Sequence, residues 1–178
     1  MTAVTRPSVR AATVKDAAHI ATVHIRSWQA AYRGLLPQQY LDGLSVSERT
    51  DRWRDRLTAT DWSKSGVVVA VPGPDLLGFA GFCPTRDHDQ YDVRVGEIKQ
   101  IYLLPEAWGK GLGQRLMSTA VRRMAEAGYA QATLWALATN VRARRFYEKT
   151  GWVADGATKS EDVDGFPIVQ VRYRKQLG

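Results

Sequence analysis

Apolar side chains in the first part of the chain recur at the spacing of an α-helix. The pattern predicts a first helix that starts near Ala17 and ends near Gly34, preceded by a capping box over residues 13–16. A second helical region covers residues 37–60 and opens with a proline, which is favoured at a helix start. The Gly43 to Ser45 segment predicts a break that divides this region into two helices.

Short runs of apolar and β-branched residues predict strands between and after the helices. Residues 67–71 and 76–83 form a predicted hairpin, because Pro72-Gly73-Pro74-Asp75 between them is strong turn chemistry. A second hairpin is predicted around the turn at residues 162–165. The full set of predicted strands is 8–12, 67–71, 76–83, 94–103, 130–137, 151–159 and 166–174.

Two more helices are predicted in the second half. Apolar residues keep helical spacing from Leu112 to about Ala127, and Gly128 supplies a stop. A shorter helix begins at Asn140 and ends before Gly151. The alternation of helices and strands predicts an α/β or α+β protein.

Composition is that of a soluble globular protein and sets bounds on its class. The 178 residues are 44% hydrophobic and 24% charged, which suits one domain over residues 1–178. Cys83 is the sole cysteine, so an internal disulfide is excluded, and the histidines show no metal-ligand spacing. Residues 1–14 lack an apolar signal core and no run of about 18 apolar residues occurs. We therefore expect a cytoplasmic protein without a metal.

The segment Trp108-Gly109-Lys110-Gly111-Leu112-Gly113-Gln114 follows a predicted strand and opens a predicted helix. Backbone N–H groups at a helix start lack intrahelical partners and carry the positive end of the helix dipole, so they favour an anion such as a phosphate. Glycine permits close approach of a ligand and positive φ angles. An ordinary glycine-rich turn is the alternative, because the spacing matches neither the dinucleotide fingerprint nor the P-loop.

A second motif, Asn140 to Trp152 (NVRARRFYEKTGW), favours the anion site over an ordinary turn. The order of strand, glycine loop, helix, strand and this motif resembles the GCN5-related N-acetyltransferases (GNAT), which transfer an acetyl group from acetyl-CoA to an amine. The resemblance is specific in the second half of the chain and looser in the first. One departure is Trp108, which stands where the family usually has Gln or Arg.

The resemblance implies a mixed central sheet flanked by helices and splayed between strands 94–103 and 130–137. The pantetheine arm of the cofactor would insert there through main-chain hydrogen bonds. Asn140 would bind the pantetheine amides, or it would cap its helix. The implied cofactor-binding residues are Ile101, Tyr102, Leu103, Gly109, Lys110, Gly111, Leu112, Gly113, Gln114, Asn140, Ala143, Tyr147 and Lys149.

Family positions also imply the chemistry. Glu97 would act as general base, through a water, on an amine that is otherwise protonated at neutral pH; the alternative is an ion pair with Lys99 or Arg94. The backbone N–H of Ile101 would stabilise the negative charge that develops on the thioester oxygen. Tyr147 would protonate the departing thiolate, or it would only pack beside its neighbour.

The acceptor amine is less defined. Trp28 and Tyr32 on the first helix are candidates to line its site, although Trp28 also fits an apolar core stripe. The loop at residues 86–92 carries Asp87, Asp89 and Asp92, which would attract a cationic acceptor or simply be hydrated. A small amine and a protein N-terminus both stay open, as does a homodimer.

The net charge of +7 and the cofactor motifs suggest two other classes of protein. A basic surface attracts polyphosphates, and coenzyme A is one of them, whereas no nucleic-acid-binding signature accompanies the charge. A nucleic-acid-binding module is therefore not favoured. A silent acyl-CoA-binding module would keep the glycine loop and Asn140, but the presence of both Glu97 and Tyr147 argues against it.

Overall fold

The structure is a computed structural model that describes residues 8–71, 73, 75–90, 92, 94–163 and 165–178. Residues 1–7 of the segment assessed for a signal core lie outside the described residues. So do Pro72 and Pro74 of the first predicted turn and Asp164 of the second.

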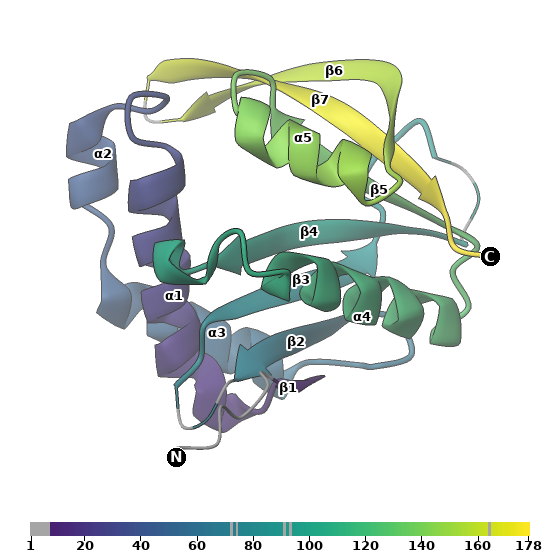
Figure 1. Ribbon diagram of the computed structural model, residues 1–178, viewed down its shortest axis with the longest axis horizontal. Helices are drawn as coiled ribbons and strands as arrows, with labels where there is room; N and C mark the ends of the chain where they lie inside the picture. Colours follow the sequence, from purple (N-terminus) through teal and green to yellow (C-terminus); the bar gives the residue numbers. More distant parts are fainter. Residues whose placement is uncertain (1–7, 72, 74, 91, 93, 164) are drawn as a thin grey trace.

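Seven strands form one mixed sheet with the order β1-β2-β3-β4-β5-β7-β6 (Figure 1). Every predicted strand is present, most within two residues of its expected bounds. The hairpin strands at the end of the chain are longer than expected, because their pairing continues to Val163 opposite Phe166. The strands are β1 Ser8–Ala11, β2 Gly66–Val71, β3 Gly78–Pro84, β4 Val95–Leu103, β5 Gln131–Leu137, β6 Val153–Val163 and β7 Phe166–Gln176.

The helices are α1 Ala17–Ala31, α2 Gln38–Asp42, α3 Val46–Thr58, α4 Leu112–Glu126 and α5 Val141–Lys149. The expected break in the second helical region is confirmed, because Ser45 caps α3 by accepting a hydrogen bond from the backbone of Glu48. The capping box at Thr13 and Asp16 is also present, but it closes a short 3-10 turn that leads into α1 rather than α1 itself.

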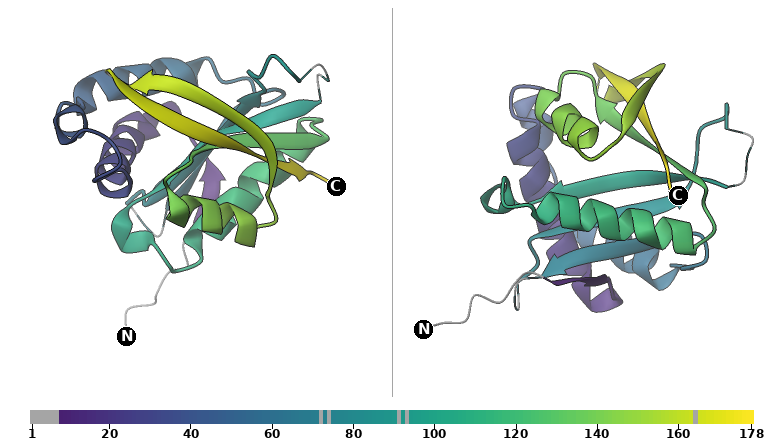
Figure 2. Two further views of the ribbon diagram at one scale, coloured as in Figure 1. Left: turned by 90° about the horizontal axis from the view of Figure 1, so that it is seen from above. Right: turned by 45° about the vertical axis from the view of Figure 1, so that its right-hand side comes forward.

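The helices form layers on both faces of the sheet (Figures 1 and 2). α4 covers one face, where Leu116, Ala120 and Met124 pack against the strands in the larger core cluster. α1 and α3 cover the opposite face, where Ile20 and Trp53 are buried with Phe79 of β3 in a second cluster. A mixed sheet covered by helices on both faces is thus confirmed.

The sheet opens between β4 and β5. These parallel strands pair only at Val95–Gln131, Gly96–Ala132 and Glu97–Thr133, although both strands continue well past this point. The splay that the family resemblance implied is therefore present, and the part of β4 from residue 98 to 103 has no pairing with β5. On its other side β4 stays paired with β3, with a bulge that places Lys99 as the additional residue.

Candidate functional site

The glycine loop leads from the end of β4 into α4. Gly109 and Gly111 have φ angles of 72° and 75°, a left-handed conformation that favours glycine, and a Cβ at either position would meet no atom within 4 Å. The first backbone bond of α4 runs from Arg115 N–H to the Gly111 carbonyl. Within the part of the chain that the structure describes, the amides of residues 109–114 donate to no protein group. This row of amides is an anion-binding arrangement.

Gly113 has a different reason to be glycine. Its φ angle lies outside the left-handed region, and a Cβ there would approach the ring of Phe146 on α5 to 3.3 Å. The absence of a side chain at Gly113 therefore lets α4 and α5 pack closely, and it leaves the Gly113 backbone N–H in the row of amides.

Trp108, the departure from the family pattern, joins the loop to its surroundings. Its indole N–H donates to the Leu103 carbonyl at 3.0 Å, at the end of β4. The guanidinium carbon of Arg142, in the first turn of α5, lies 3.1 Å from the centre of the indole ring. Trp108 therefore links β4, the glycine loop and α5 through its side chain.

Asn140 caps α5. Its side-chain oxygen accepts from the Ala143 amide at 3.1 Å, which is one of the two roles considered from the sequence. The side-chain NH₂ donates to no group among the described residues, so it is free to bind a ligand amide. Ala143 is half-buried, and Lys149 at the other end of α5 is exposed.

Tyr147 lies on α5 with its ring between two aromatic neighbours. The ring centroid is 5.5 Å from that of Phe146 and 5.8 Å from that of Tyr173 on β7. Burial and the neighbouring phenols Tyr102 and Tyr173 raise the pKa of Tyr147, so its hydroxyl carries a proton at neutral pH. This hydroxyl makes no hydrogen bond within the described residues.

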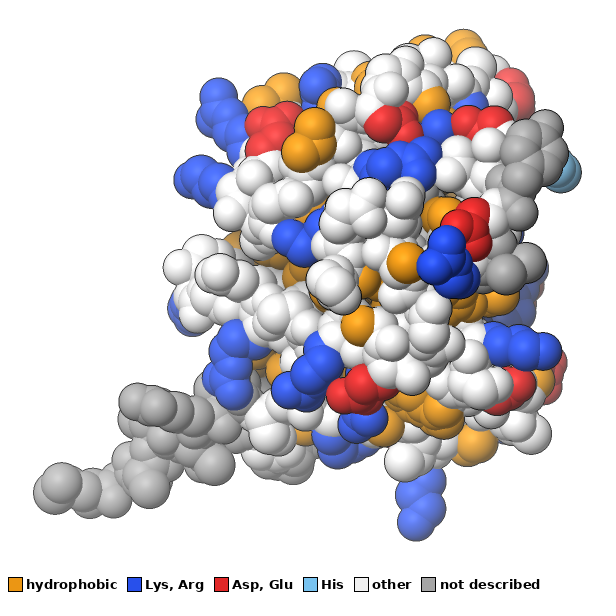
Figure 3. Space-filling model, turned by 90° about the vertical axis from the view of Figure 1, so that its right-hand side faces the viewer, with side chains coloured by type: hydrophobic (Ala, Val, Ile, Leu, Met, Phe, Trp, Pro, Cys, Tyr) orange, Lys and Arg blue, Asp and Glu red, His pale blue; other side chains and the backbone are white. Residues whose placement is uncertain are grey.

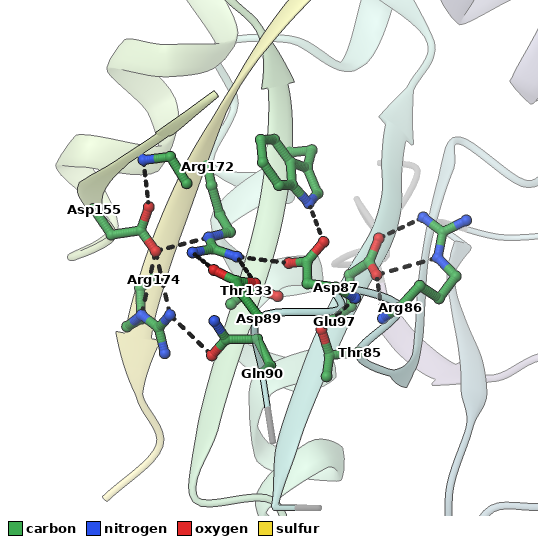
Figure 4. A network of polar contacts seen from close by, with 12 residues as sticks. Thr85, Arg86, Asp87, Asp89, Gln90, Glu97, Thr133, Asp155, Arg172 and Arg174 are labelled. Carbon is green, nitrogen blue, oxygen red and sulfur yellow. Dashed lines mark hydrogen bonds and ion pairs between the residues drawn. The ribbon is translucent and has the colours of Figure 1, made fainter. Parts of the chain in front are cut away.

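Glu97 is buried on β4 where the splay begins. Its carboxylate accepts from the backbone N–H and Nε of Arg86 at 3.3 and 3.1 Å and from Nη2 at 2.5 Å (Figure 4). The predicted ion-pair partners Lys99 and Arg94 are wrong: Arg94 pairs with Asp92 instead. Arg86 was missed because it lies eleven residues earlier in sequence and reaches Glu97 through the loop after β3.

The part of β4 that does not pair with β5 presents its side chains to both faces of the sheet. Ile101 and Leu103 pack against the α4 side, whereas Tyr102 packs on the α1 side. There the Tyr102 ring stacks on His24 at 5.0 Å and 19°. His24 is buried, and burial followed by the charges of Arg49 and Arg56 lowers its pKa to about 3.

Trp28 and Tyr32, the predicted acceptor residues, lie together at the end of α1. Their ring centroids are 5.1 Å apart, and Trp28 is 6.2 Å from Tyr102. Burial, followed by the charge of Tyr147, raises the pKa of Tyr32 to about 12. The indole N–H of Trp28 is buried without a partner in the described chain.

The acidic loop after β3 is occupied by internal contacts (Figure 4). Asp87 accepts from the Trp135 indole, and Arg172, whose side chain is only 6% exposed, binds Asp87, Asp89 and Asp155 at 2.7–3.2 Å. Hydrogen bonding from Arg172 strongly lowers the pKa of Asp89. Arginines therefore neutralise the carboxylates that would attract a cationic acceptor, with Asp92 paired to Arg94, while Asp89 and Asp92 stay exposed to water as a hydrated loop requires. Arg172 was missed because periodicity alone cannot show that a charged side chain on β7 is buried against a loop far away in sequence.

Charge at the surface is mixed on the face shown in Figure 3, where Lys and Arg side chains are scattered among acidic ones. Two surface hollows of about 410 and 400 Å³ lie beside Ser63 and Ala127 and contain none of the predicted catalytic or cofactor-binding residues. Within the described ranges, no helix is long and apolar enough to cross a membrane. In the same ranges, no three side chains of His, Cys, Asp or Glu lie close enough together to bind a metal ion.

Comparison with known proteins agrees with this geometry. The Acetyltransferase (GNAT) family matches residues 27–152. The uncharacterized N-acetyltransferase YuaI of Bacillus subtilis is 33% identical over 135 residues, which are 75% of this chain and 73% of that protein. An uncharacterized N-acetyltransferase of Archaeoglobus fulgidus is 36% identical over 124 residues, 69% of this chain and 80% of its own length.

Solved structures show the same fold. PaiA N-acetyltransferase from Thermoplasma acidophilum, in complex with coenzyme A, has a TM-score of 0.74 at 21% identity and covers 96% of this chain and 99% of its own. YncA from Salmonella typhimurium, solved with its cofactor acetyl-CoA, has a TM-score of 0.73 at 19% identity over 97% and 95% of the two chains. Together with the family match, these findings establish that this chain belongs to the GNAT family of acetyltransferases.

Proposed function

We propose that the protein transfers the acetyl group of acetyl-CoA to a primary amine by direct attack of the amine on the thioester. The observation that carries the proposal is the row of free amides at residues 109–114, next to a sheet that opens between β4 and β5. Two proteins of the same fold are solved with coenzyme A or acetyl-CoA. The donors of the loop and of the open edge of β4 match the diphosphate and the amides of that molecule, which supports the proposal.

The amides of the glycine loop would bind the diphosphate, because they combine unpaired N–H donors with the positive end of α4. Lys110 is exposed in the same loop and adds positive charge. The amide groups of the pantetheine arm would bind to the main chain of residues 101–103 along the edge of β4 that β5 leaves open, apart from the Leu103 carbonyl, which accepts from Ser27 and Trp108. The free NH₂ of Asn140 would bind them too.

Glu97 would accept the proton of the amine through a water. Arg86 fixes the carboxylate and uses three of its roughly four acceptor positions, which leaves one for a water. Such a base is needed because an alkyl amine with a pKa of about 10.4 is almost fully protonated at neutral pH.

Two further groups would act on the thioester. The backbone N–H of Ile101 would stabilise the negative charge that develops on the carbonyl oxygen. Tyr147 would donate its proton to the departing thiolate, since its hydroxyl is protonated and has no other partner within the described residues. Trp28 and Tyr32 would line the path of the acceptor.

The direct test is a panel of amines incubated with acetyl-CoA and the protein, with free thiol as the readout. We expect saturable thiol release with at least one amine and an acetylated product by mass spectrometry. Binding of coenzyme A without thiol release from any amine would favour a silent acyl-CoA-binding module. Absence of binding would contradict the proposal as a whole.

A further inference from the structure

A group of cations lies on the α1/α3 face of β3 and β4, beside the proposed site. Arg49 and Arg56 are seven residues apart on α3, which places both on the side of the helix that carries buried Trp53. The Arg56 guanidinium lies 4.9 Å from the Trp53 ring. Lys99 joins them from the bulge in β4.

These cations have no acidic partner within the residues that the structure describes. The ion pair on α3 is Arg54 with Asp51, on another side of the helix, and Glu97 is already bound by Arg86. Burial and the charge of Arg86 lower the pKa of Arg56, and partial burial together with Arg56 and Arg86 lowers that of Lys99. A bound anion would therefore stabilise the charged forms of Arg56 and Lys99.

Two side-chain donors lie together over Gly81 of β3. A Cβ on this residue would lie 3.0 Å from Nη2 of Arg56 and 3.3 Å from Nε2 of Gln100, so both side chains occupy the space over the same backbone position. Neither donates to a protein group within the described chain. A carboxylate accepts such a pair of donors well.

The position of Gln100 on β4 limits the distance between the carboxylate and the amine of the ligand. Gln100 is one or two residues before the Ile101 N–H and Tyr102, which corresponds to about 3 to 7 Å of strand. The nearby carboxylates that would favour a purely cationic acceptor are neutralised by arginines, as Asp87 and Asp89 are by Arg172. The local charge thus favours an acceptor that carries an anion close to its amine.

We propose that the acceptor is a small amino acid, whose carboxylate binds to Arg56, Gln100 and Lys99 while its amine faces the thioester beside residue 101. This inference rests on the proposed function and narrows its substrate. The aromatic groups of Trp28, Tyr32 and Tyr40 would contact the rest of the amino acid.

The test compares amino acids with matched amines that lack the carboxylate. L-phenylalanine, L-phenylalaninamide and 2-phenylethylamine form one such set, and L-methionine with 3-(methylthio)propylamine forms another; thiol release from acetyl-CoA is measured with the full chain. We expect kcat/KM to be at least about tenfold higher for the amino acid in the preferred set, the effect of a charge-assisted contact.

Two variants locate the effect. Arg56→Gln and Lys99→Gln should raise the KM for the amino acid and reduce its advantage over the matched amine, with the KM for acetyl-CoA unchanged. Lys99 is exposed, so its variant tests the proposal even where Arg56→Gln fails to fold. Arg52→Gln, an exposed residue of α3, is the matched control and should change neither value.

The failures are distinguishable. Equal or better turnover of the amines that lack a carboxylate would overturn this inference, and so would turnover of peptides but of no free amino acid. Either result would leave the proposed acetyltransferase function intact. An unchanged preference in both variants would also overturn it. No thiol release with any amine would remove both the inference and the proposed function.

Discussion

The cofactor side and the acceptor side of this protein are built in different ways. On the cofactor side, the binding groups that we propose are main-chain amides of six consecutive residues, 109–114, presented by one loop and one helix. On the acceptor side, the proposed groups are side chains from α1, α3, β4 and the loop that carries Arg86. One side depends on backbone conformation, and the other depends on how distant segments pack.

This difference predicts how each side responds to mutation. A backbone site is damaged mainly by changes at glycine, because its contacts come from the main chain and a new side chain there changes the backbone conformation or blocks the approach of the ligand. A side-chain site is tuned residue by residue, so its substrate preference changes without loss of the fold.

The largest effect is expected from Gly111→Glu on the cofactor side. The change adds a negative charge and a side chain where φ is 75°, next to the proposed diphosphate site, so the affinity for coenzyme A should fall by a factor on the order of a thousand. Calorimetric titration measures it. Gly156→Glu is the matched control, because Gly156 has a φ of 86° and equally open surroundings far from the loop. Equal affinity in both variants would refute the loop assignment.

The next largest effect is expected on stability, from the ion pairs of Arg172 that connect the acidic loop after β3 to β7. Arg172→Met removes the cation shared by Asp87, Asp89 and Asp155, so the free energy of unfolding should fall by about 3 kcal/mol. Urea denaturation measures it. Arg94→Gln breaks the exposed pair with Asp92, which water and salt screen, and should lower the free energy of unfolding far less. Similar losses in the two variants would show that the network around Arg172 contributes little.

The same contrast explains what the sequence could predict. Glycine spacing and the motif from Asn140 to Trp152 are local, so the loop, α5 and the splay next to β4 followed from them and from the family resemblance. The Glu97–Arg86 pair and the Arg172 network join residues that are far apart in sequence. Local periodicity carries no information about such pairs, and in the absence of a contact signal the nearest charges, Lys99 and Arg94, were the natural but incorrect partners.

Glu97→Gln tests whether Glu97 is the general base that accepts the proton of the amine. If Glu97 accepts the proton, kcat should fall about a hundredfold at neutral pH, with little change in the affinity for acetyl-CoA. The pH dependence of kcat is the decisive measurement, because a base gives an ascending limb that the amide lacks. Arg86→Gln is the companion variant: loss of the same limb there would indicate that the pair acts as a unit. Unchanged profiles in both would assign Glu97 to structure alone.

His24 makes the acceptor side sensitive to acid. Its pKa is lowered from 6.5 to about 3 in the folded protein, so below pH 6.5 the unfolded chain binds a proton that the folded chain does not. Stability therefore falls as pH decreases from 6.5 toward 3, by about 2 kcal/mol between pH 7 and 5. Urea denaturation at both pH values measures this loss, and His24→Gln should remove that part of it. An equal pH dependence in the variant would contradict the assignment.

The smallest effect is expected for Tyr147→Phe, which removes only a hydroxyl from a packed ring. A thiol with a pKa near 8.5 leaves readily, so the loss of its proton donor should lower kcat by about tenfold rather than by the factor of a hundred or more typical of general acid catalysis. The ring contacts with Phe146 and Tyr173 persist, so the affinity for acetyl-CoA should not change. Acetyl thioesters whose thiols have lower pKa values provide the sharper measurement. Their turnover should depend less on the hydroxyl, whereas a uniform loss across the series would place Tyr147 in packing rather than proton transfer.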